Sequence, residues 1–129
     1  MTYTLLTYLY RDAANYKAHG ALLLSGEMTS DLHRRLRESL IDGEYFIPEK
    51  VGIPALREQL YAGSGAQASR DDHLLHELVD LRPATPQEIS TMTPVAEVEE
   101  FVMRFEGKKR DGTGWWAELG TGLLDLLLP

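Results

Sequence analysis

The sequence predicts an α+β fold: a small three-stranded, mainly antiparallel sheet in strand-strand-helix-strand order, with helices packed on one face and a helical C-terminal region. Three observations support this class. Residues 3–10 are rich in Tyr, Thr and Leu, and a second apolar run follows a polar interruption at 11–17, as in a hairpin. Leucines at a spacing of four come next, which indicates a helix. Residues 73–81 supply the third strand.

The first helix is the most strongly patterned element. Residues 29–31 offer three successive candidates for the N-cap. Leu32, Leu36 and Leu40 follow on one side, and the Asp42-Gly43 pair is expected to end the helix at a C′ glycine. The sequence therefore predicts one amphipathic helix between the second and third strands.

Residues 73–81 are ambiguous between strand and helix. In a strand, Leu75, Val79 and Leu81 would lie on one face. In a helix, His73, His76 and Glu77 would lie together. We favour the strand, because it gives the hairpin a third partner.

The remaining elements are predicted from caps and apolar stripes. Thr85-Pro86-Gln87-Glu88 has the pattern of a capping box. Val95, Val98, Val102 and Phe105 form a helical stripe that Gly107 is expected to end. We expect one domain over 1–129, in which an α+β core at 1–82 carries a helical C-terminal extension at 83–129 packed on it.

Composition excludes several classes of protein. The chain has 129 residues, of which 43% are hydrophobic and 26% charged, as in an ordinary globular domain. It contains no Cys, which removes disulfides, a thiolate nucleophile and Cys-ligated zinc. Neither a signal peptide nor an apolar run of bilayer length is found, so the expectation is a cytoplasmic protein without membrane contact.

The net charge of −7 is unevenly distributed. Residues 1–62 carry 7 basic and 8 acidic side chains, whereas residues 63–129 carry 6 basic and 12 acidic ones. An acidic chain is repelled by phosphate backbones unless its cations gather on one face. Binding to nucleic acid is therefore disfavoured, although Lys108-Lys109-Arg110 lies near Trp115-Trp116, and a protein partner is expected.

The polar segment between the first two strands is the best candidate for a binding loop. Arg and Tyr side chains are strong anchors at interfaces. The alternative is a turn whose Asp and Asn side chains cap their own backbone. The candidate binding residues of this segment are Arg11, Asp12, Asn15, Tyr16 and Lys17.

A second candidate is a cleft for a small ligand or a metal ion. His73 and His76 lie among acidic residues, but the His-Glu-x-x-His motif is absent, and on a strand the two rings face opposite ways. We therefore predict no metal and no cofactor. The residues that would converge on such a cleft are Tyr10, Arg11, Asn15, Tyr45, His73 and His76.

The apolar tail and the missing motifs bear on function. Residues 123–128 contain five leucines that must be buried within the domain or against a second copy, so a homodimer is one of the two arrangements that would bury them. No phosphate-binding glycine loop and no Gly-x-Ser-x-Gly nucleophile motif occurs. Nothing in the sequence favours an enzyme, although none of this excludes one.

Three segments resemble a set of small uncharacterised bacterial proteins. They are Tyr10-Arg11-Asp12-Ala13-Ala14-Asn15-Tyr16-Lys17, Glu44-Tyr45-Phe46-Ile47-Pro48-Glu49-Lys50-Val51-Gly52 and Asp72-His73-Leu74-Leu75-His76-Glu77. The resemblance covers roughly residues 3–82. It implies a bacterial or mobile-element origin and transfers no activity.

Two hypotheses follow from these residues. The first is a non-enzymatic protein-binding or regulatory module that contacts its partner through an acidic surface and the Arg11–Lys17 loop. The second is a small-ligand or metal-binding protein, with or without enzymatic activity, that uses the cleft described above.

Overall fold

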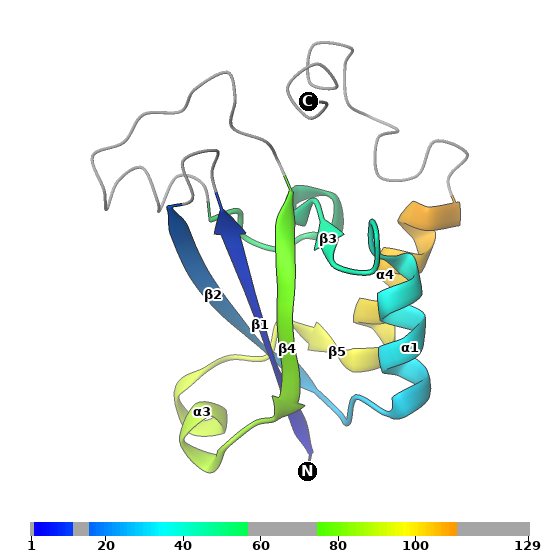
Figure 1. Ribbon diagram of the computed structural model, residues 1–129. Coiled ribbons are helices and arrows are strands. Elements are labelled where there is room, and N and C mark those ends of the chain that lie inside the picture. The colour runs from blue at the N-terminus through cyan, green and yellow to red at the C-terminus, as the bar shows by residue number, and fades with distance from the viewer. Residues whose placement is uncertain (1, 12–15, 57–74, 111–129) are drawn as a thin grey trace.

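The fold is built on a curled five-stranded sheet (Figure 1). The computed structural model describes residues 2–11, 16–56 and 75–110. Strand order is β3-β4-β1-β2-β5, and β5 runs parallel to β2 while the other pairs are antiparallel. The predicted three-stranded, mainly antiparallel sheet is therefore wrong, because the sheet is mixed and has two more strands. The strands are β1 (Tyr3–Arg11), β2 (Lys17–Ser25), β3 (Tyr45–Phe46), β4 (His76–Pro83) and β5 (Ala96–Glu97).

The two additional strands lie at the edges of the sheet and have two residues each. Such short strands cannot show the alternation of apolar and polar residues by which a strand is predicted. Contacts to distant residues hold them in place. The backbone N–H of Val95 donates to the carbonyl of Leu23 at 2.9 Å, which aligns β5 beside β2.

The predicted hairpin is confirmed and forms the middle of the sheet. β1 and β2 pair over nine positions, from Tyr3 opposite Ser25 to Arg11 opposite Lys17. Because side chains alternate along a strand, Leu6, Tyr8 and Tyr10 share the face that carries the main core.

The third predicted strand is confirmed from His76 onward, and it contains a bulge. Tyr8 pairs with Leu78 and Thr7 pairs with Asp80, so Val79 has no partner on β1. An extra residue in a strand reverses the face of the sheet to which each later side chain of that strand points. Leu78 and Leu81 therefore both face the main core, although they are three residues apart. The alternation predicted from the sequence had placed these two leucines on opposite faces.

The helix after β2 begins where its cap predicts. α1 spans Ser30–Ser39, and the Thr29 hydroxyl accepts from the backbone N–H of Leu32 at 3.2 Å. The expected C′ glycine is wrong, because Asp42 (φ 53°) and Gly43 (φ 73°) form a tight turn that pairs Ile41 with Tyr45. The other helical elements are the 3₁₀ helix η1 (Pro48–Val51), α3 (Pro86–Thr91) and α4 (Val98–Arg110).

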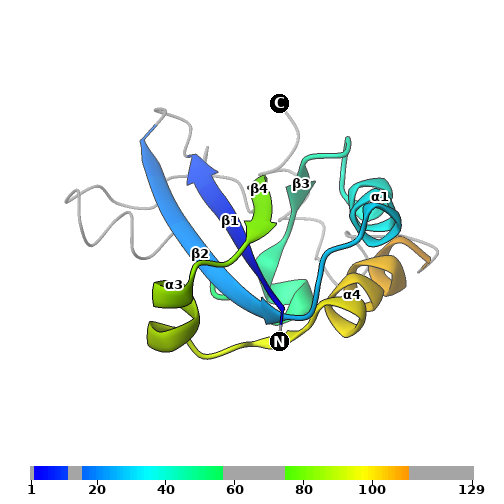
Figure 2. The same cartoon turned by 90° about the horizontal axis from the view of Figure 1, so that it is seen from below.

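The prediction that the helices pack on one face of the sheet is wrong. α1 and α4 lie side by side along one side of the curved sheet, whereas α3 lies apart from them (Figure 2). α3 has no buried residue. Arg35 of α1 and Glu106 of α4 join the packed pair through hydrogen bonds of 3.0 and 2.8 Å.

The apolar face of α4 differs from the predicted stripe in two places. Val95 precedes the helix and is 48% exposed, whereas Phe101 is completely buried. Gly107 lies within α4 and does not end it. Aromatic rings of α4 reach the sheet, since the Phe105 and Phe46 ring centroids are 5.6 Å apart. Residues of the predicted extension thus belong to the same core as β1 and β2.

In the part of the chain that the structure describes, no helix has the length and apolarity needed to cross a membrane.

Candidate functional site

Six of the predicted binding residues lie at one end of the sheet. Hydrogen-bonded pairing of β1 with β2 and β4 brings their ends together, and β3 joins β4 there. Asp12, Asn15 and His73 lie outside the described residues. The six that the fold gathers are Tyr10, Arg11, Tyr16, Lys17, Tyr45 and His76.

Two of these residues are part of the core. Tyr10 and His76 are both 0% exposed, and their ring centroids are 4.9 Å apart. His76 Nε2 accepts a hydrogen bond from the backbone N–H of Leu56 at 3.0 Å. A buried imidazole that accepts at Nε2 satisfies a backbone donor that would otherwise lack a partner. Through this hydrogen bond, His76 joins β4 to residue 56.

The surface of this end carries charges in close contact. Arg11 Nε donates to a carboxylate oxygen of Glu77 at 3.3 Å, and these side chains are 41% and 24% exposed. Tyr45 pairs with Glu77 across β3 and β4. Burial, followed by the carboxylates of Glu44, Glu77 and Asp42, raises the pKa of the Tyr45 phenol, so it stays protonated. The phenol is therefore a hydrogen-bond donor in an acidic setting.

Beside this charged group, the start of β2 presents an exposed aromatic ring and a cation. Tyr16 is 56% exposed, and Lys17 beside it is also exposed. Exposed tyrosines next to cations are common anchors at protein interfaces.

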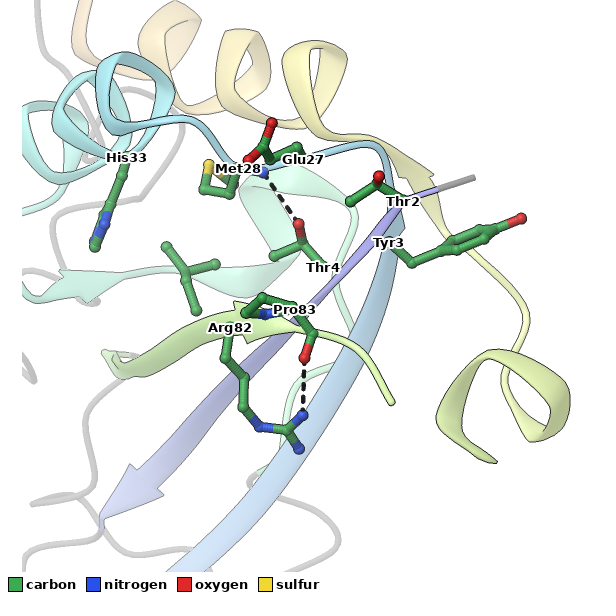
Figure 3. A pocket seen from close by; sticks show the side chains of 9 residues that line it. Thr2, Tyr3, Thr4, Glu27, Met28, His33, Arg82 and Pro83 are labelled. Atoms are coloured by element: carbon green, nitrogen blue, oxygen red, sulfur yellow. Dashed lines mark hydrogen bonds between the residues drawn. The ribbon is translucent and has the colours of Figure 1, made fainter. Parts of the chain in front are cut away.

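A small hollow lies at the opposite end of the sheet (Figure 3). Its volume is about 140 Å³, well below the roughly 300–1,000 Å³ of clefts that enclose drug-sized ligands. The start of β1, the loop after β2, α1 and the end of β4 surround it. The lining residues on which its chemistry depends are Thr4, Glu27, Met28, His33, Leu81 and Pro83.

Thr4 holds the loop that forms one wall of the hollow. Its buried hydroxyl donates to the Gly26 carbonyl at 2.9 Å and accepts from the Met28 N–H at 3.1 Å. These bonds attach the loop to β1, and Figure 3 shows the one between Thr4 and Met28. The sequence did not predict this hollow, because its lining residues come from four separate segments.

Two arginines near the hollow are bound to other groups. Arg82, which also lines the hollow, donates to both carboxylate oxygens of Glu88, at 2.9 and 2.7 Å. Arg37 donates to His33 Nε2 at 3.3 Å and to the Gly43 carbonyl at 3.2 Å. The His33 ring thus accepts from Arg37 at Nε2.

Among residues 2–11, 16–56 and 75–110, no three His, Asp or Glu side chains are grouped so that they would hold a metal ion.

The comparisons with known proteins give one partial similarity. Over 84 residues, the chain is 29% identical to glucose-6-phosphate isomerase from Cupriavidus metallidurans. The aligned region is 63% of this chain and 15% of the isomerase, so the chain spans a small part of that relative's length. No family model matches the chain, and no solved structure matches it significantly.

Proposed function

We propose that this chain is a protein-binding or regulatory module that recognises a basic partner through its acidic surface and the Arg11–Lys17 loop. The observation that carries the proposal is the distribution of ion pairs. Six arginines have side chains that the structure describes, and five of these contact a carboxylate within 4 Å. Their positive charges are therefore largely neutralised inside the molecule.

Several exposed carboxylates in the described residues have no such counterion. They lie on separate elements, and the net charge of −7 adds to their potential. A surface of this kind attracts a basic protein and accelerates its encounter. The carboxylates are those of Glu27, Asp42, Glu44, Glu97 and Glu99.

Exposed Tyr16 and Lys17 support a contact role for the loop, because an aromatic anchor provides the affinity that diffuse charge does not. The cleft hypothesis has less support. Tyr10 and His76, two of its central residues, are fully buried in the core. Isomerisation of a sugar phosphate is not proposed, because the similar region makes up 15% of the isomerase.

The test is affinity capture from the cells that make the protein, followed by mass spectrometry and binding measurements with the purified partner. We expect a basic protein in stoichiometric amount, released as salt is raised to roughly 0.5 M because exposed charges are then screened. The double variant Tyr16→Ala, Lys17→Ala should weaken binding about five- to thirty-fold, by loss of an anchor of about 1–2 kcal/mol.

Gln87→Ala on α3 is the control, since Gln87 is exposed and lies on the helix that is apart from the core. It should leave binding unchanged. Failure to retain any partner, or equal binding by the loop variant and the control, would contradict the proposal.

A further inference from the structure

We infer that the hollow between the start of β1, the end of β4 and α1 receives a lysine or arginine side chain of the partner. The inference rests on the proposed function and deepens it, because it names the chemical group that one part of the acidic surface recognises. Three features of the hollow support it: its charge, its apolar wall and its size.

The charge of the hollow comes from Glu27. This carboxylate is exposed and has no ion pair among the described residues. Arg82 does not oppose it, because its guanidinium is held by Glu88 and by the Pro83 carbonyl. Figure 3 shows the Arg82 side chain extending away from Glu27. A cation is therefore the complementary ligand.

A second cation nearby is Arg37, which bonds to the lining residue His33. Its guanidinium donates to His33 and to the Gly43 carbonyl. These two bonds direct it toward the turn after α1. Arg37 is bound to these two groups and does not line the hollow, so Glu27 is the carboxylate that an incoming side chain meets.

The apolar part of the lining matches an aliphatic stem. Met28, Leu81 and Pro83 provide methylene, methyl and ring carbon surface on the same hollow that contains Glu27. Lysine and arginine bury their stems along apolar surface and keep the charged end near polar groups. A volume of about 140 Å³ suits one side chain and is small for a whole metabolite.

The hollow is also pre-organised. Thr4 holds both Gly26 and Met28 by hydrogen bonds, which fixes the loop that carries Glu27. A fixed wall lowers the entropy lost on binding.

The experiment is an NMR titration of the whole protein with three small probes. N-acetyl-lysine methylamide carries the cation, N-acetyl-norleucine methylamide has a similar stem without it, and inorganic phosphate tests the opposite charge. We expect the lysine probe to shift the backbone amide signals of Thr4, Met28 and Leu81, with a dissociation constant on the order of 1–10 mM. Norleucine and phosphate should bind at least about five-fold more weakly.

Glu27→Gln should weaken the lysine probe about five-fold, the value of an exposed ion pair. Glu44→Gln is the matched control, because it removes the same charge at the opposite end of the sheet and should leave the shifts of Thr4, Met28 and Leu81 by the lysine probe unchanged. The inference is overturned if the lysine probe causes no shift, if norleucine or phosphate binds equally well, or if the two variants behave alike.

The two proposals fail in distinguishable ways. If the partner is captured but the lysine probe causes no shift, the inference about the hollow is wrong and the binding function stands. If no partner is captured, the proposed function fails whatever the probe does.

Discussion

At the scale of single residues, Glu88 gathers several hydrogen bonds on one carboxylate. It accepts from both Arg82 nitrogens and from the backbone N–H of Thr85, whose hydroxyl in turn accepts from the Glu88 N–H. Hydrogen bonds from Arg82, then from Thr85, lower the pKa of Glu88 to about 2. The capping box thus gains a guanidinium partner from β4.

A pH dependence follows from this lowered pKa. In the unfolded chain Glu88 has a pKa of about 4.3, so its contribution to stability is complete above that pH and is lost as pH falls toward 2. We expect NMR titration to place the carboxyl near 2, and Arg82→Gln to raise it toward its ordinary value. A wild-type titration near 4.3 would contradict the ion pair.

Tyr8 shows the opposite shift. Its buried hydroxyl donates to the Pro54 carbonyl at 2.8 Å, and burial raises the pKa of the phenol to about 12. Tyr8→Phe should lower the free energy of unfolding by about 1 kcal/mol near neutral pH, because one hydrogen bond is lost.

The raised pKa of Tyr8 gives a second readout. Its stabilising effect is complete below the unfolded pKa of 10 and is lost as pH rises through 12. Denaturant unfolding should therefore show the difference between wild type and Tyr8→Phe shrinking above pH 10. A constant difference up to pH 12 would be inconsistent with an ionisable buried phenol.

At the scale of elements, the pairing of β1 with β2 depends on a missing side chain. Gly20 lies opposite Tyr8, and a Cβ at Gly20 would lie 2.8 Å from Tyr8 Cε1 and 2.9 Å from Cζ. Glycine lets the Tyr8 ring lie over β2, where it belongs to the main core.

Two identical substitutions should therefore have opposite effects. Gly20→Ala should destabilise the protein by about 1–3 kcal/mol, because the Tyr8 ring must move. Gly107→Ala is the matched control: Gly107 is exposed within α4, its Cβ would meet nothing within 4 Å, and alanine favours helix by about 1 kcal/mol. Thermal unfolding checks both, and a loss of stability in both variants would contradict this description of Gly20.

At the scale of the whole molecule, the contact between α1 and α4 joins the two halves of the chain. Arg35 and Glu106 are 71 residues apart in sequence, and their side chains are 28% and 23% exposed. The two hydrogen bonds between them are parallel, which favours an arginine. Their partial burial limits screening by solvent.

A double-mutant cycle measures this link. Arg35→Ala and Glu106→Ala should show a coupling energy of about 1 kcal/mol in denaturant unfolding. Arg34 and Glu38, at 57% and 61% exposed, form the comparison pair within α1 and should couple by at most about 0.5 kcal/mol. Equal coupling energies in the two cycles would mean that the Arg35–Glu106 pair stabilises the protein no more than an exposed ion pair does.

Local patterns were sufficient for the elements that the sequence predicted correctly. The long strands β1 and β2, the Thr29 cap and the Thr85 capping box depend on residues within a few positions of one another. Side-chain alternation and cap hydrogen bonds act over that same distance. The candidate binding residues Tyr16 and Lys17 were predicted in this way, from a polar interruption between two apolar runs.

Tertiary structure decided the rest, because it depends on contacts between distant residues. β3 and β5 exist through their neighbours in the sheet, and the bulge at Val79 turns Leu81 onto the core face. His76 was predicted as a binding residue, and its burial against residue 56 arises only from the packing of β4. The hollow beside Glu27 is assembled from four separate segments. A pattern along the chain does not show which distant segments come into contact. The pairing of the strands in the folded sheet decides this.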